Sequence, residues 1–395
     1  MNKKIVAFIP ARGQSKGIPK KNIKNFAGKP LIYWSALSAS LCDLIDRVYV
    51  STEDEEIKNT VLSFNLPKVE VISRTKKSAT DKAPTELAVL EFAQKYQFEI
   101  MVLLQATSPL TTYKDIENAL KLYFEKKYDS LLSVVRQKRF IWDFDSKTKK
   151  WVSINYDYKK RPRRQNFEGY FVENGAIYIM KKEGLLRYKN RLYGNIGVYE
   201  MPEYTYNELD SELDWQILEN LAYKVKEFYL TYWLKNIKLL GLDVDGVLTD
   251  GGVYHSKDGE EFLKFNRIDG KGIELVRKSG IDVVVISSEN LPIIRKRCDK
   301  LRIKEVYTGV RDKLAVLKKT VEKKNLKPSE IAFIGDDVQD IPVMEWAGFS
   351  AAPSNALDIV KIKANYVCKR KGGEGAVREV CNLIISTKNV YSKNW

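Results

Sequence analysis

Acidic side chains follow three predicted strands in the C-terminal half of the chain. An apolar strand, Lys238 to Leu242, ends in Asp243-Val244-Asp245-Gly246-Val247-Leu248-Thr249-Asp250-Gly251, a second strand ends at Ser287, Lys313 begins a helix, and a third strand ends in Gly335-Asp336-Asp337-Val338-Gln339-Asp340. In an open α/β sheet the carboxyl ends of the strands converge on one crevice, so we expect these side chains to meet there. Carboxylates, a hydroxyl and a lysine suit a site for Mg²⁺ and a phosphoryl group. A lone Asp-x-Asp would indicate little more than a turn, but the full set in this order is specific.

A glycine- and lysine-rich turn follows the first predicted strand. It reads Ala11-Arg12-Gly13-Gln14-Ser15-Lys16-Gly17-Ile18-Pro19-Lys20-Lys21-Asn22. Glycine permits a tight turn that presents backbone N–H groups to phosphate oxygens, and Arg12 and Lys16 add positive charge. The string is neither a Walker A sequence nor Gly-x-Gly-x-x-Gly. By itself it indicates either a phosphate site or an ordinary strand–helix turn.

The histidine and cysteine counts exclude several chemistries. His255 is the only histidine, so Ser-His-Asp hydrolysis, His-Glu-x-x-His zinc chemistry and histidine proton relays lack their residues. We expect His255 to face solvent in a hairpin strand. The four cysteines, Cys42, Cys298, Cys368 and Cys381, show no Cys-x-x-Cys spacing, which predicts neither disulfides nor a zinc site. Catalysis must then use carboxylates, lysines, arginines and a hard metal ion.

Two α/β domains are predicted to position these residues. With 395 residues the chain is too long for one ordinary core, and strands alternate with helices through both halves, as in doubly wound domains. We place the boundary near Asn236, which gives domains 1–236 and 237–395. Strands are expected at Ile5–Pro10, Arg47–Ser51 and Ile100–Gln105, helices after Thr111 (with Asp115 in the first turn) and from about Leu213 to Leu230, and a β-hairpin from Val253 to Phe265.

The formal net charge of +16 at pH 7 favours anionic substrates such as nucleotide phosphates. The alternative is that lysines solvate amphipathic helices, since the charge is scattered through segments such as Lys121 to Lys127 and Lys318 to Lys324. We favour this alternative over nucleic-acid binding. No apolar run approaches the length of a membrane span, and the N-terminus does not read as a signal peptide. We therefore expect a cytoplasmic protein without a membrane or nucleic-acid partner.

The loop after the first strand begins a longer series of motifs. The series continues through Ser51-Thr52-Glu53-Asp54, Leu104-Gln105-Ala106-Thr107-Ser108-Pro109, Arg161-Pro162-Arg163-Arg164-Gln165, Glu173-Asn174-Gly175-Ala176-Ile177-Tyr178 and Glu208-Leu209-Asp210-Ser211-Glu212-Leu213-Asp214. Over about residues 4 to 225 it closely resembles the N-acylneuraminate (CMP-sialic acid) cytidylyltransferases and, secondarily, the CMP-Kdo synthetases. The Arg-Arg-Gln and Glu-Asn-Gly segments favour the sialic acid branch. The resemblance implies a Rossmann-like nucleotidyltransferase domain that transfers CMP from CTP to a sialic-acid-type sugar and releases pyrophosphate.

The same resemblance implies which residues bind the substrates. Little covalent work falls to the protein in such a transfer, so positioning and charge neutralisation dominate, with Arg12 and Lys16 as the catalytic cations. The implied CTP-binding residues are Arg12, Gly13, Lys16, Asn22, Arg74, Ala83 and Thr85, and the implied sugar-side residues are Gln105, Arg164 and Tyr178. Arg164 suits the sugar carboxylate.

A magnesium ion is also implied in the N-terminal half, with Asp210 as a ligand. The sequence departs from the family at two positions: Gln14 replaces the usual second glycine of the first motif, and Glu208 replaces the usual paired Asp. Glu208 and Asp210 stand two apart and share one face of an extended segment. Glu208 is therefore either a second metal ligand or a solvated loop acid.

The acidic set of the C-terminal half is similar to that of the haloacid dehalogenase superfamily, and residues 238 to 385 resemble the Kdo-8-phosphate phosphatase group. The resemblance implies a Rossmannoid domain with a minimal cap. Asp243 would be the nucleophile that forms an aspartyl-phosphate, and Asp245 the general acid and base. Ser287 and Lys313 would bind the phosphoryl oxygens. Asp340 would orient the lysine or a metal-bound water.

The resemblance further implies Mg²⁺ held by Asp243, the backbone carbonyl of Asp245 and Asp336, with Asp337 as ligand support or structure. In this group a neighbouring subunit covers the site in place of a large cap, which implies a homo-oligomer, a tetramer formed through the phosphatase domain. The segment Lys371 to Arg378 matches the group's covering segment.

The residues after Ser287 bear on the choice of sugar phosphate. Ser288-Glu289 stands where the Kdo-8-phosphate phosphatases typically have Gly-Arg, and Glu289 with Arg297 and Lys300 resembles the Kdn-9-phosphate phosphatases. A carboxylate can accept hydrogen bonds from sugar hydroxyls, and Arg and Lys can pair with the sugar carboxylate. Alternatively, Arg297 and Lys300 are solvated neighbours on a helix.

The favoured interpretation is a bifunctional enzyme that dephosphorylates a nonulosonate 9-phosphate and then attaches CMP to the free sugar. One alternative is a cytidylyltransferase with a catalytically silent, oligomerising phosphatase-like domain. The complete acidic set argues against that, because a silent domain has no physical reason to keep repelling carboxylates together. A second alternative is a CMP-Kdo synthetase fused to a Kdo-8-phosphate phosphatase. A nucleic-acid-binding protein would rest on charge alone.

Overall fold

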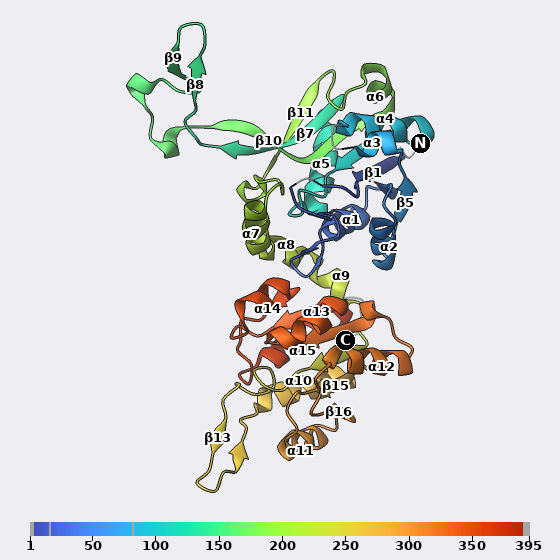
Figure 1. The fold of residues 1–395 in the computed structure, drawn as a ribbon, viewed down its shortest axis with the longest axis vertical. Coiled ribbons are helices and arrows are strands. Elements are labelled where there is room, and N and C mark those ends of the chain that lie inside the picture. Colours follow the sequence, from blue (N-terminus) through green and yellow to red (C-terminus); the bar gives the residue numbers. More distant parts are fainter. Residues whose placement is uncertain (1–3, 16, 81–82, 390–395) are drawn as a thin grey trace. The chain divides into compact units, whose positions relative to one another are not determined.

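The computed structural model describes residues 4–15, 17–80 and 83–389. They form two compact units. One comprises the described residues of Met1–Lys24 and Pro30–Leu221, and the other those of Asn25–Lys29 and Ala222–Trp395. Both units are built on parallel-rich sheets with helices, so the predicted α/β class is confirmed (Figure 1). The boundary near Asn236 stays a prediction.

A seven-stranded sheet forms the centre of the first unit, in the order β11-β7-β10-β6-β1-β4-β5. β10 is antiparallel to both of its neighbours, and the other pairs are parallel. The strands are β1 (Ile5–Pro10), β4 (Arg47–Thr52), β5 (Val69–Ser73), β6 (Ile100–Leu104), β7 (Ser130–Gln137), β10 (Tyr170–Lys181) and β11 (Ile196–Met201). The three strands predicted at Ile5–Pro10, Arg47–Ser51 and Ile100–Gln105 are therefore present, with ends that differ by one residue at most.

The helices of this unit follow the strands in the manner of a wound sheet. They are α1 (Leu31–Leu41), α2 (Glu55–Ser63), α3 (Lys76–Ala79), α4 (Thr85–Lys95), α5 (Tyr113–Glu125), α6 (Lys182–Tyr188) and α7 (Glu212–Leu221). The helix predicted after Thr111 is α5, where Thr112 and Asp115 form a capping box. Aromatic rings fill one side of the core, with Phe92 of α4 against Phe8 and Tyr49 at centroid distances of 4.7 and 5.0 Å.

A long segment between β7 and β10 projects away from this sheet (Figure 1). It carries the hairpin of β8 (Trp142–Asp145) and β9 (Lys150–Ser153) and two short 3₁₀ turns, η1 (Tyr158–Lys160) and η2 (Arg164–Asn166). Several of its large apolar side chains are exposed, Trp142 and Trp151 among them. In the same unit η3 spans Glu203–Thr205.

The second unit contains a fully parallel sheet in the order β16-β15-β12-β17-β18-β19. Its strands are β12 (Leu239–Leu242), β15 (Asp282–Ile286), β16 (Glu305–Tyr307), β17 (Ile331–Ile334), β18 (Phe349–Ala352) and β19 (Tyr366–Val367). Its helices are α8 (Tyr223–Lys226), α9 (Leu230–Leu234), α10 (Arg267–Lys278), α11 (Pro292–Lys300), α12 (Lys313–Lys323), α13 (Ile341–Trp346), α14 (Asp358–Lys363) and α15 (Ala376–Asn389), with 3₁₀ turns η4 (Glu227–Tyr229), η5 (Pro328–Glu330) and η6 (Val338–Asp340). The strands are short apolar runs whose β12 and β17 members are buried throughout, as expected for a parallel sheet covered on both faces.

Two smaller pairs of strands complete the structure. β13 (Tyr254–His255) and β14 (Glu261–Phe262) form the predicted antiparallel hairpin, and His255 is exposed in it, as expected. β2 (Asn25–Phe26) and β3 (Lys29–Pro30) form the other pair.

The single helix predicted from about Leu213 to Leu230 is wrong, because the chain forms α7, α8, η4 and α9 in succession. No Pro or Gly interrupts this stretch. Lys226 of α8 is instead buried, and its Nζ donates hydrogen bonds to the carbonyls of Ile362 and Ala364 at 2.8 and 2.6 Å. Contacts with such distant residues override local helix propensity.

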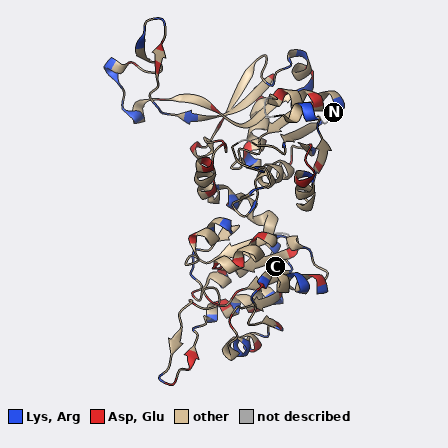
Figure 2. Cartoon of the chain, in the orientation of Figure 1, with Lys and Arg blue, Asp and Glu red and all other residues tan. Residues whose placement is uncertain are grey.

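Lys and Arg residues are spread along both units and are interspersed with Asp and Glu, as Figure 2 shows. Within the described part of the chain, none of the helices has the length and apolar character needed to cross a bilayer. All four cysteines are buried and free.

Candidate active sites

A cleft of about 280 Å³ opens at the carboxyl edge of the first unit's sheet. Residues after β1, β5 and β6 line it, because parallel strands deliver their following loops to one edge. The lining residues are Pro10, Arg12, Gln14, Ser15, Lys21, Asn22, Arg74, Ser78, Ala83, Thr85, Gln105, Ala106, Thr107, Glu208 and Asp210. The cleft thus brings together eight of the residues that the sequence predicted for CTP binding, sugar binding or metal ligation. They are Arg12, Asn22, Arg74, Ala83, Thr85, Gln105, Glu208 and Asp210.

The loop after β1 supplies one wall of the cleft and is held by its own side chains. Asn22 is buried, and its Nδ2 donates a hydrogen bond to the carbonyl of Arg12 at 2.9 Å. Nη1 of Arg12 donates to the carbonyl of Thr80 at 3.1 Å, which ties this wall to the loop before α4. Both residues were predicted to bind CTP. Lys16, predicted for the same role, lies outside the described residues.

Glu208 and Asp210, the predicted metal ligands, both line the cleft. The backbone N–H of Leu209, between them, donates to the carbonyl of Thr107 at 2.9 Å. Nζ of Lys21 lies 2.8 Å from the carbonyl of Leu209 and 3.3 Å from Oδ1 of Asp210. Burial, together with the charge of Asp210, raises the pKa of Glu208. Glu208 is therefore not a freely solvated loop acid.

The glycine of the Glu-Asn-Gly motif is explained by Glu208. Gly175 has φ +63° at the irregularity in the pairing of β10 with β7, and a Cβ there would lie 2.4 Å from the carboxyl group of Glu208. Only glycine permits both the backbone conformation and this close approach.

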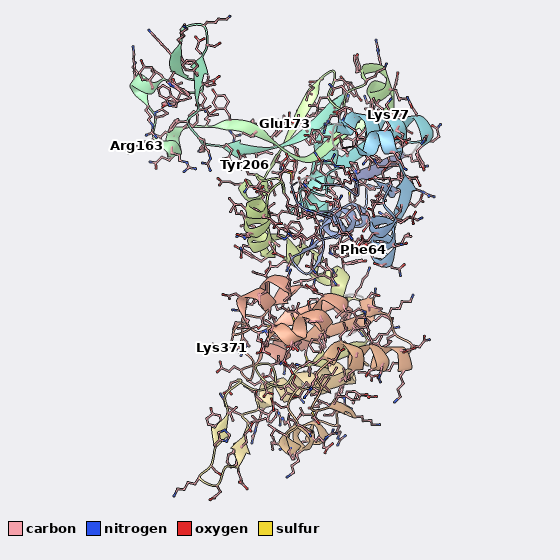
Figure 3. All side chains as sticks on the ribbon, viewed as in Figure 1. Phe64, Lys77, Arg163, Glu173, Tyr206 and Lys371 are labelled. Carbon is pink, nitrogen blue, oxygen red and sulfur yellow. The ribbon has the colours of Figure 1, made fainter. Side chains whose placement is uncertain are left out.

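Three predicted residues lie off the cleft. Tyr178 is buried in β10, and its hydroxyl donates to Oε2 of Glu173 at 3.1 Å. Arg164 is exposed in η2 on the projecting segment, where Figure 3 labels its neighbour Arg163. The N–H of Gly13 donates to Oε1 of Glu53 at 2.8 Å. Sugar contact by Arg164 and Tyr178 and phosphate contact by Gly13 stay predictions.

A second site forms where the strands of the second unit end. Asp243 follows β12, Asp336 follows β17, and Lys313 begins α12. Nζ of Lys313 lies 2.9 Å from Oδ2 of Asp243 and 2.7 Å from Oδ1 of Asp340, and all three side chains are almost fully buried. The sequence-predicted acidic set and its lysine therefore meet in one place.

Hydrogen bonds fix Asp340 within this cluster. Its Oδ2 accepts the N–H groups of Asp336 and Asp337 at 3.0 and 3.4 Å, while its Oδ1 accepts Lys313. Asp337 instead accepts the N–H of Val338 at 2.6 Å as the cap of η6. Asp337 thus has a structural contact, one of the two roles left open by the sequence.

The buried charges act strongly on one another. Burial and the charge of Asp340 raise the pKa of Asp243, although Lys313 opposes the shift. Burial lowers the pKa of Lys313, but Asp243 and Asp340 outweigh it, so that this pKa is raised. Burial, with the charges of Asp340 and Asp337, raises the pKa of Asp336 to about 7. Such shifts are typical of functional sites and of buried ion-pair networks.

The oxygens of Asp243, Asp336 and Asp340 fit a metal ion. One from each lies within 4.8 Å of the other two. Three carboxylates without a soft ligand suit Mg²⁺ better than a transition metal. Since Asp340 already accepts hydrogen bonds from Lys313 and two N–H groups, Asp243 and Asp336 are the freer donors.

Asp245 and Ser287 border the same cluster. Oγ1 of Thr249 lies 3.4 Å from Oδ1 of Asp245, and burial, followed by the charge of Glu289, raises the pKa of Asp245. Ser287 is fully buried, and its Oγ accepts the N–H of Glu289 at 3.0 Å. Glu289 itself is exposed next to the cluster, where it is within electrostatic reach of Asp245.

Arg297 and Lys300 lie further along α11. Arg297 is half-buried, its Nη2 donates to the carbonyl of Asn266 at 3.0 Å, and its guanidinium lies over the ring of Phe265 at 5.6 Å. Lys300 is exposed at the end of the helix. Arg297 thus has a structural partner, and a sugar-binding role for either residue stays a prediction.

The segment Lys371 to Arg378 packs on the loop after β12 of its own chain. The N–H of Gly373 donates to the carbonyl of Val247 at 3.0 Å, and a Cβ on Gly372 would lie 1.7 Å from the carbonyl oxygen of Gly246. Asp269, buried in α10, accepts the N–H groups of Gly375 and Arg378 at 3.1 and 2.8 Å. Covering of a neighbouring subunit by this segment stays a prediction.

The sequence analysis did not assign a site role to five polar residues that line the first cleft: Gln14, Ser15, Lys21, Ser78 and Thr107. Lys21 contacts Asp210, Ser78 contacts Arg74, and Thr107 has a buried hydroxyl for which the described residues provide no hydrogen-bond partner. Lys21 and Thr107 lie within motifs that the sequence had already indicated. The motifs therefore marked these two positions, but they did not show that the two side chains face the cleft.

Comparisons with known proteins agree with both sites. Residues 6–239 match the family model described as cytidylyltransferase, and residues 278–380 match that of haloacid dehalogenase-like hydrolases. N-acylneuraminate cytidylyltransferase B of Danio rerio is 34% identical, over 98% of this chain and 92% of that protein. The 3-deoxy-D-manno-octulosonate 8-phosphate phosphatase KdsC of Escherichia coli (strain K12) is 42% identical, over 38% of this chain and 80% of that protein.

One solved structure similar to the C-terminal part is the 3-deoxy-D-manno-octulosonate 8-phosphate phosphatase from Moraxella catarrhalis, in complex with magnesium ion, phosphate ion and KDO. It is 33% identical, with a TM-score of 0.40, over 41% of this chain and 93% of that one.

The fold and the two sites define an enzyme in which a nucleotidyltransferase is joined to a hydrolase of the haloacid dehalogenase type. The chain belongs to the N-acylneuraminate cytidylyltransferase family. Both resemblances inferred from the sequence motifs are thereby confirmed.

Proposed function

We propose that the first unit transfers CMP from CTP to a sialic-acid-type nonulosonate and that the second unit dephosphorylates the corresponding 9-phosphate. The observation that carries the proposal is the presence of two sites in the described residues: a cationic cleft with paired carboxylates, and a buried Asp–Lys–Asp cluster. The whole-chain similarity to an N-acylneuraminate cytidylyltransferase supports the choice of sugar.

In the transferase the sugar's anomeric hydroxyl attacks the α-phosphorus of CTP. A new O–P bond forms as the hydroxyl loses its proton to solvent water, the bond from the α-phosphorus to the bridging oxygen breaks, and pyrophosphate leaves. Arg12, Lys16 and Lys21 neutralise the phosphates, Arg74 and Asn22 hold the nucleotide side, and Gln105 holds the sugar side. Mg²⁺, held by Asp210 and Glu208, would neutralise charge on the phosphates.

In the phosphatase a carboxylate oxygen of Asp243 attacks the phosphorus, and the bond to the sugar oxygen breaks. Asp245, whose pKa is raised by burial and Glu289, donates the proton that the leaving oxygen needs. Asp245 then takes a proton from the water that attacks the aspartyl-phosphate, which releases phosphate and restores Asp243. Lys313 and Ser287 bind the phosphoryl oxygens, and Mg²⁺ held by Asp243, Asp336 and the carbonyl of Asp245 would neutralise their charge.

The order of steps also supports the pairing of these activities. The phosphatase product is the free sugar that the transferase consumes, so one chain would carry out consecutive reactions. The alternative substrate is Kdo 8-phosphate, which the similarity of the C-terminal part to KdsC favours. We prefer the nine-carbon substrate because Glu289 borders the site, where its carboxylate can accept hydrogen bonds from the longer sugar's hydroxyls.

Two assays test the proposal. Pyrophosphate release is measured with CTP and each of several free nonulosonates and Kdo, and phosphate release is measured from their phosphates. We expect kcat/KM to be higher for nine-carbon 9-phosphates than for Kdo 8-phosphate, and Glu289→Ala to reduce that preference. A preference for Kdo 8-phosphate, or an unchanged preference in Glu289→Ala, would reject the sugar assignment. The homotetramer remains a separate proposal, which sedimentation of the full chain tests.

A further inference from the structure

Glu53 occupies a junction that the proposed chemistry does not use. β4 ends at Thr52, and α2 begins at Glu55 with Asp54 as its N-cap, so Glu53 is the single residue between the strand and the capped end of the helix. Oδ1 of Asp54 accepts the N–H groups of Glu56 and Ile57 at 2.8 and 3.0 Å. A capped helix end of this kind fixes the local backbone and therefore the direction of the Glu53 side chain.

One carboxylate oxygen of Glu53 holds the phosphate loop. Its Oε1 accepts the N–H of Gly13 at 2.8 Å. The loop lies so close to this junction that a Cβ on Gly13 would be 2.4 Å from Oδ2 and 2.9 Å from Cβ of Asp54. The N–H group that the sequence predicted to face a phosphate is therefore occupied by Glu53, and glycine is needed here for close packing.

The other oxygen of Glu53 faces Arg74, which lines the cleft. Oε2 lies 4.0 Å from Nε of Arg74, and the two side chains are 22% and 7% exposed. Burial lowers the pKa of Arg74 and the charge of Glu53 opposes that shift, so the two groups attract each other in the structure. Partly buried charges are screened less than surface pairs, so this attraction is stronger than for an exposed pair.

A second carboxylate, that of Glu91, is linked to Arg74 through Ser78. The guanidinium of Arg74 donates to the carbonyl of Ser78, whose hydroxyl donates to Oε2 of Glu91 at 2.9 Å. Glu91 also accepts the N–H of Thr75 at 3.1 Å. Arg74 thus has contacts with both Glu53 and Ser78, and among these contacts Glu53 alone joins it to the phosphate loop.

We propose that Glu53 is a positioning residue for CTP, which fixes the phosphate loop and Arg74 relative to each other before the nucleotide binds. The proposal rests on the cytidylyltransferase function proposed above. Arg74 lines the cleft, whereas neither Gly13 nor Glu53 is among the described residues that do, so Glu53 acts through its neighbours. Ordering these groups in advance reduces the entropy lost on binding and so strengthens affinity.

Titration calorimetry of the full chain with CTP and Mg²⁺ tests this role. Glu53→Ala removes both contacts, and we expect the Kd for CTP to rise about tenfold, the effect of losing a hydrogen bond to a charged group. Glu53→Gln keeps an acceptor for Gly13 but loses the charge that faces Arg74, so we expect a rise of about threefold. In an Arg74→Ala background, Glu53→Gln should add no further loss. In turnover assays KM for CTP should rise while kcat changes little.

Glu55→Gln is the matched control, because Glu55 is 76% exposed on the adjacent helix and forms an ion pair with Lys58. It should bind CTP as the wild type does. A Kd within twofold of wild type for Glu53→Ala, or an equal effect of Glu53→Gln with and without Arg74, would overturn the proposal. If Glu53→Ala does not fold, the isosteric Glu53→Gln series decides. A wild-type chain that does not bind CTP would instead refute the proposed function.

Discussion

Nζ of Lys313 lies 2.9 Å from Oδ2 of Asp243, and both side chains are almost fully buried. Oδ1 of Asp340 accepts a hydrogen bond from the same ammonium group at 2.7 Å. Lys313 therefore has two roles. It neutralises the charge of two buried carboxylates, and it provides the positive charge that would bind a phosphoryl group.

Lys313→Met should expose this double role. Removing this lysine leaves the buried carboxylates of Asp243 and Asp340 without their ion-pair partner, which costs about 3–5 kcal/mol of unfolding free energy. We also expect phosphate release to fall by about a hundredfold or more, as when a charge-stabilising donor is removed from other sites. Urea unfolding and a phosphate assay measure the two effects. Lys319→Met, an exposed lysine on the same helix, should change neither, and a fully active Lys313→Met would contradict the assignment.

Gly246→Ala should damage the phosphatase site by displacing Asp336. Gly246 has φ +70°, and a Cβ there would lie 1.9 Å from Oδ2 of Asp336. Gly259 offers a matched control, since its φ is +79° but nothing lies within 4 Å of an added Cβ. Both substitutions should cost about 1–2 kcal/mol from backbone strain at positive φ, but only Gly246→Ala should lose phosphate release. Equal activity of the two variants would show that the close approach to Asp336 is unimportant.

Protons should compete with Mg²⁺ at Asp336. The pKa of this carboxyl is raised from 3.8 to about 7 by burial and by Asp340 and Asp337. Between these values the folded, metal-free protein keeps a proton that the unfolded chain has lost, so this group's contribution to stability falls as the pH rises through that window. Mg²⁺ should offset the loss, and the Mg²⁺-induced rise in Tm should be larger at pH 8 than at pH 6. Thermal unfolding with Mg²⁺ or EDTA measures this, and an equal rise at both pH values would contradict it.

The strands that carry the sites were predictable, because their buried apolar runs and the polar residues after them are local signals. Ile5–Pro10 is β1 as predicted, and Asp243, Ser287 and Asp336 follow strands that share one edge. The broken helix after Leu213 was not predictable, since Lys226 is held by carbonyls more than a hundred positions away.

The direction of individual side chains was the second feature that the sequence could not predict. The Gly-rich loop indicated phosphate binding, but the N–H of Gly13 is taken by Glu53 from a different strand end. The Arg-Arg-Gln motif indicated sugar recognition, but Arg164 lies on the projecting segment, outside the cleft residues of its own chain. Motifs report which residues matter together, whereas these contacts depend on how separate segments meet in space.

The central claim is that one chain carries two independent activities, and paired substitutions test it most directly. Pyrophosphate release with CTP and a free nonulosonate, and phosphate release from its 9-phosphate, are measured for Asp243→Asn and for Asp210→Ala. We predict that Asp243→Asn abolishes phosphate release and leaves pyrophosphate release nearly intact, while Asp210→Ala does the reverse. Phosphate release that survives in Asp243→Asn, or loss of both activities in either folded variant, would contradict the account.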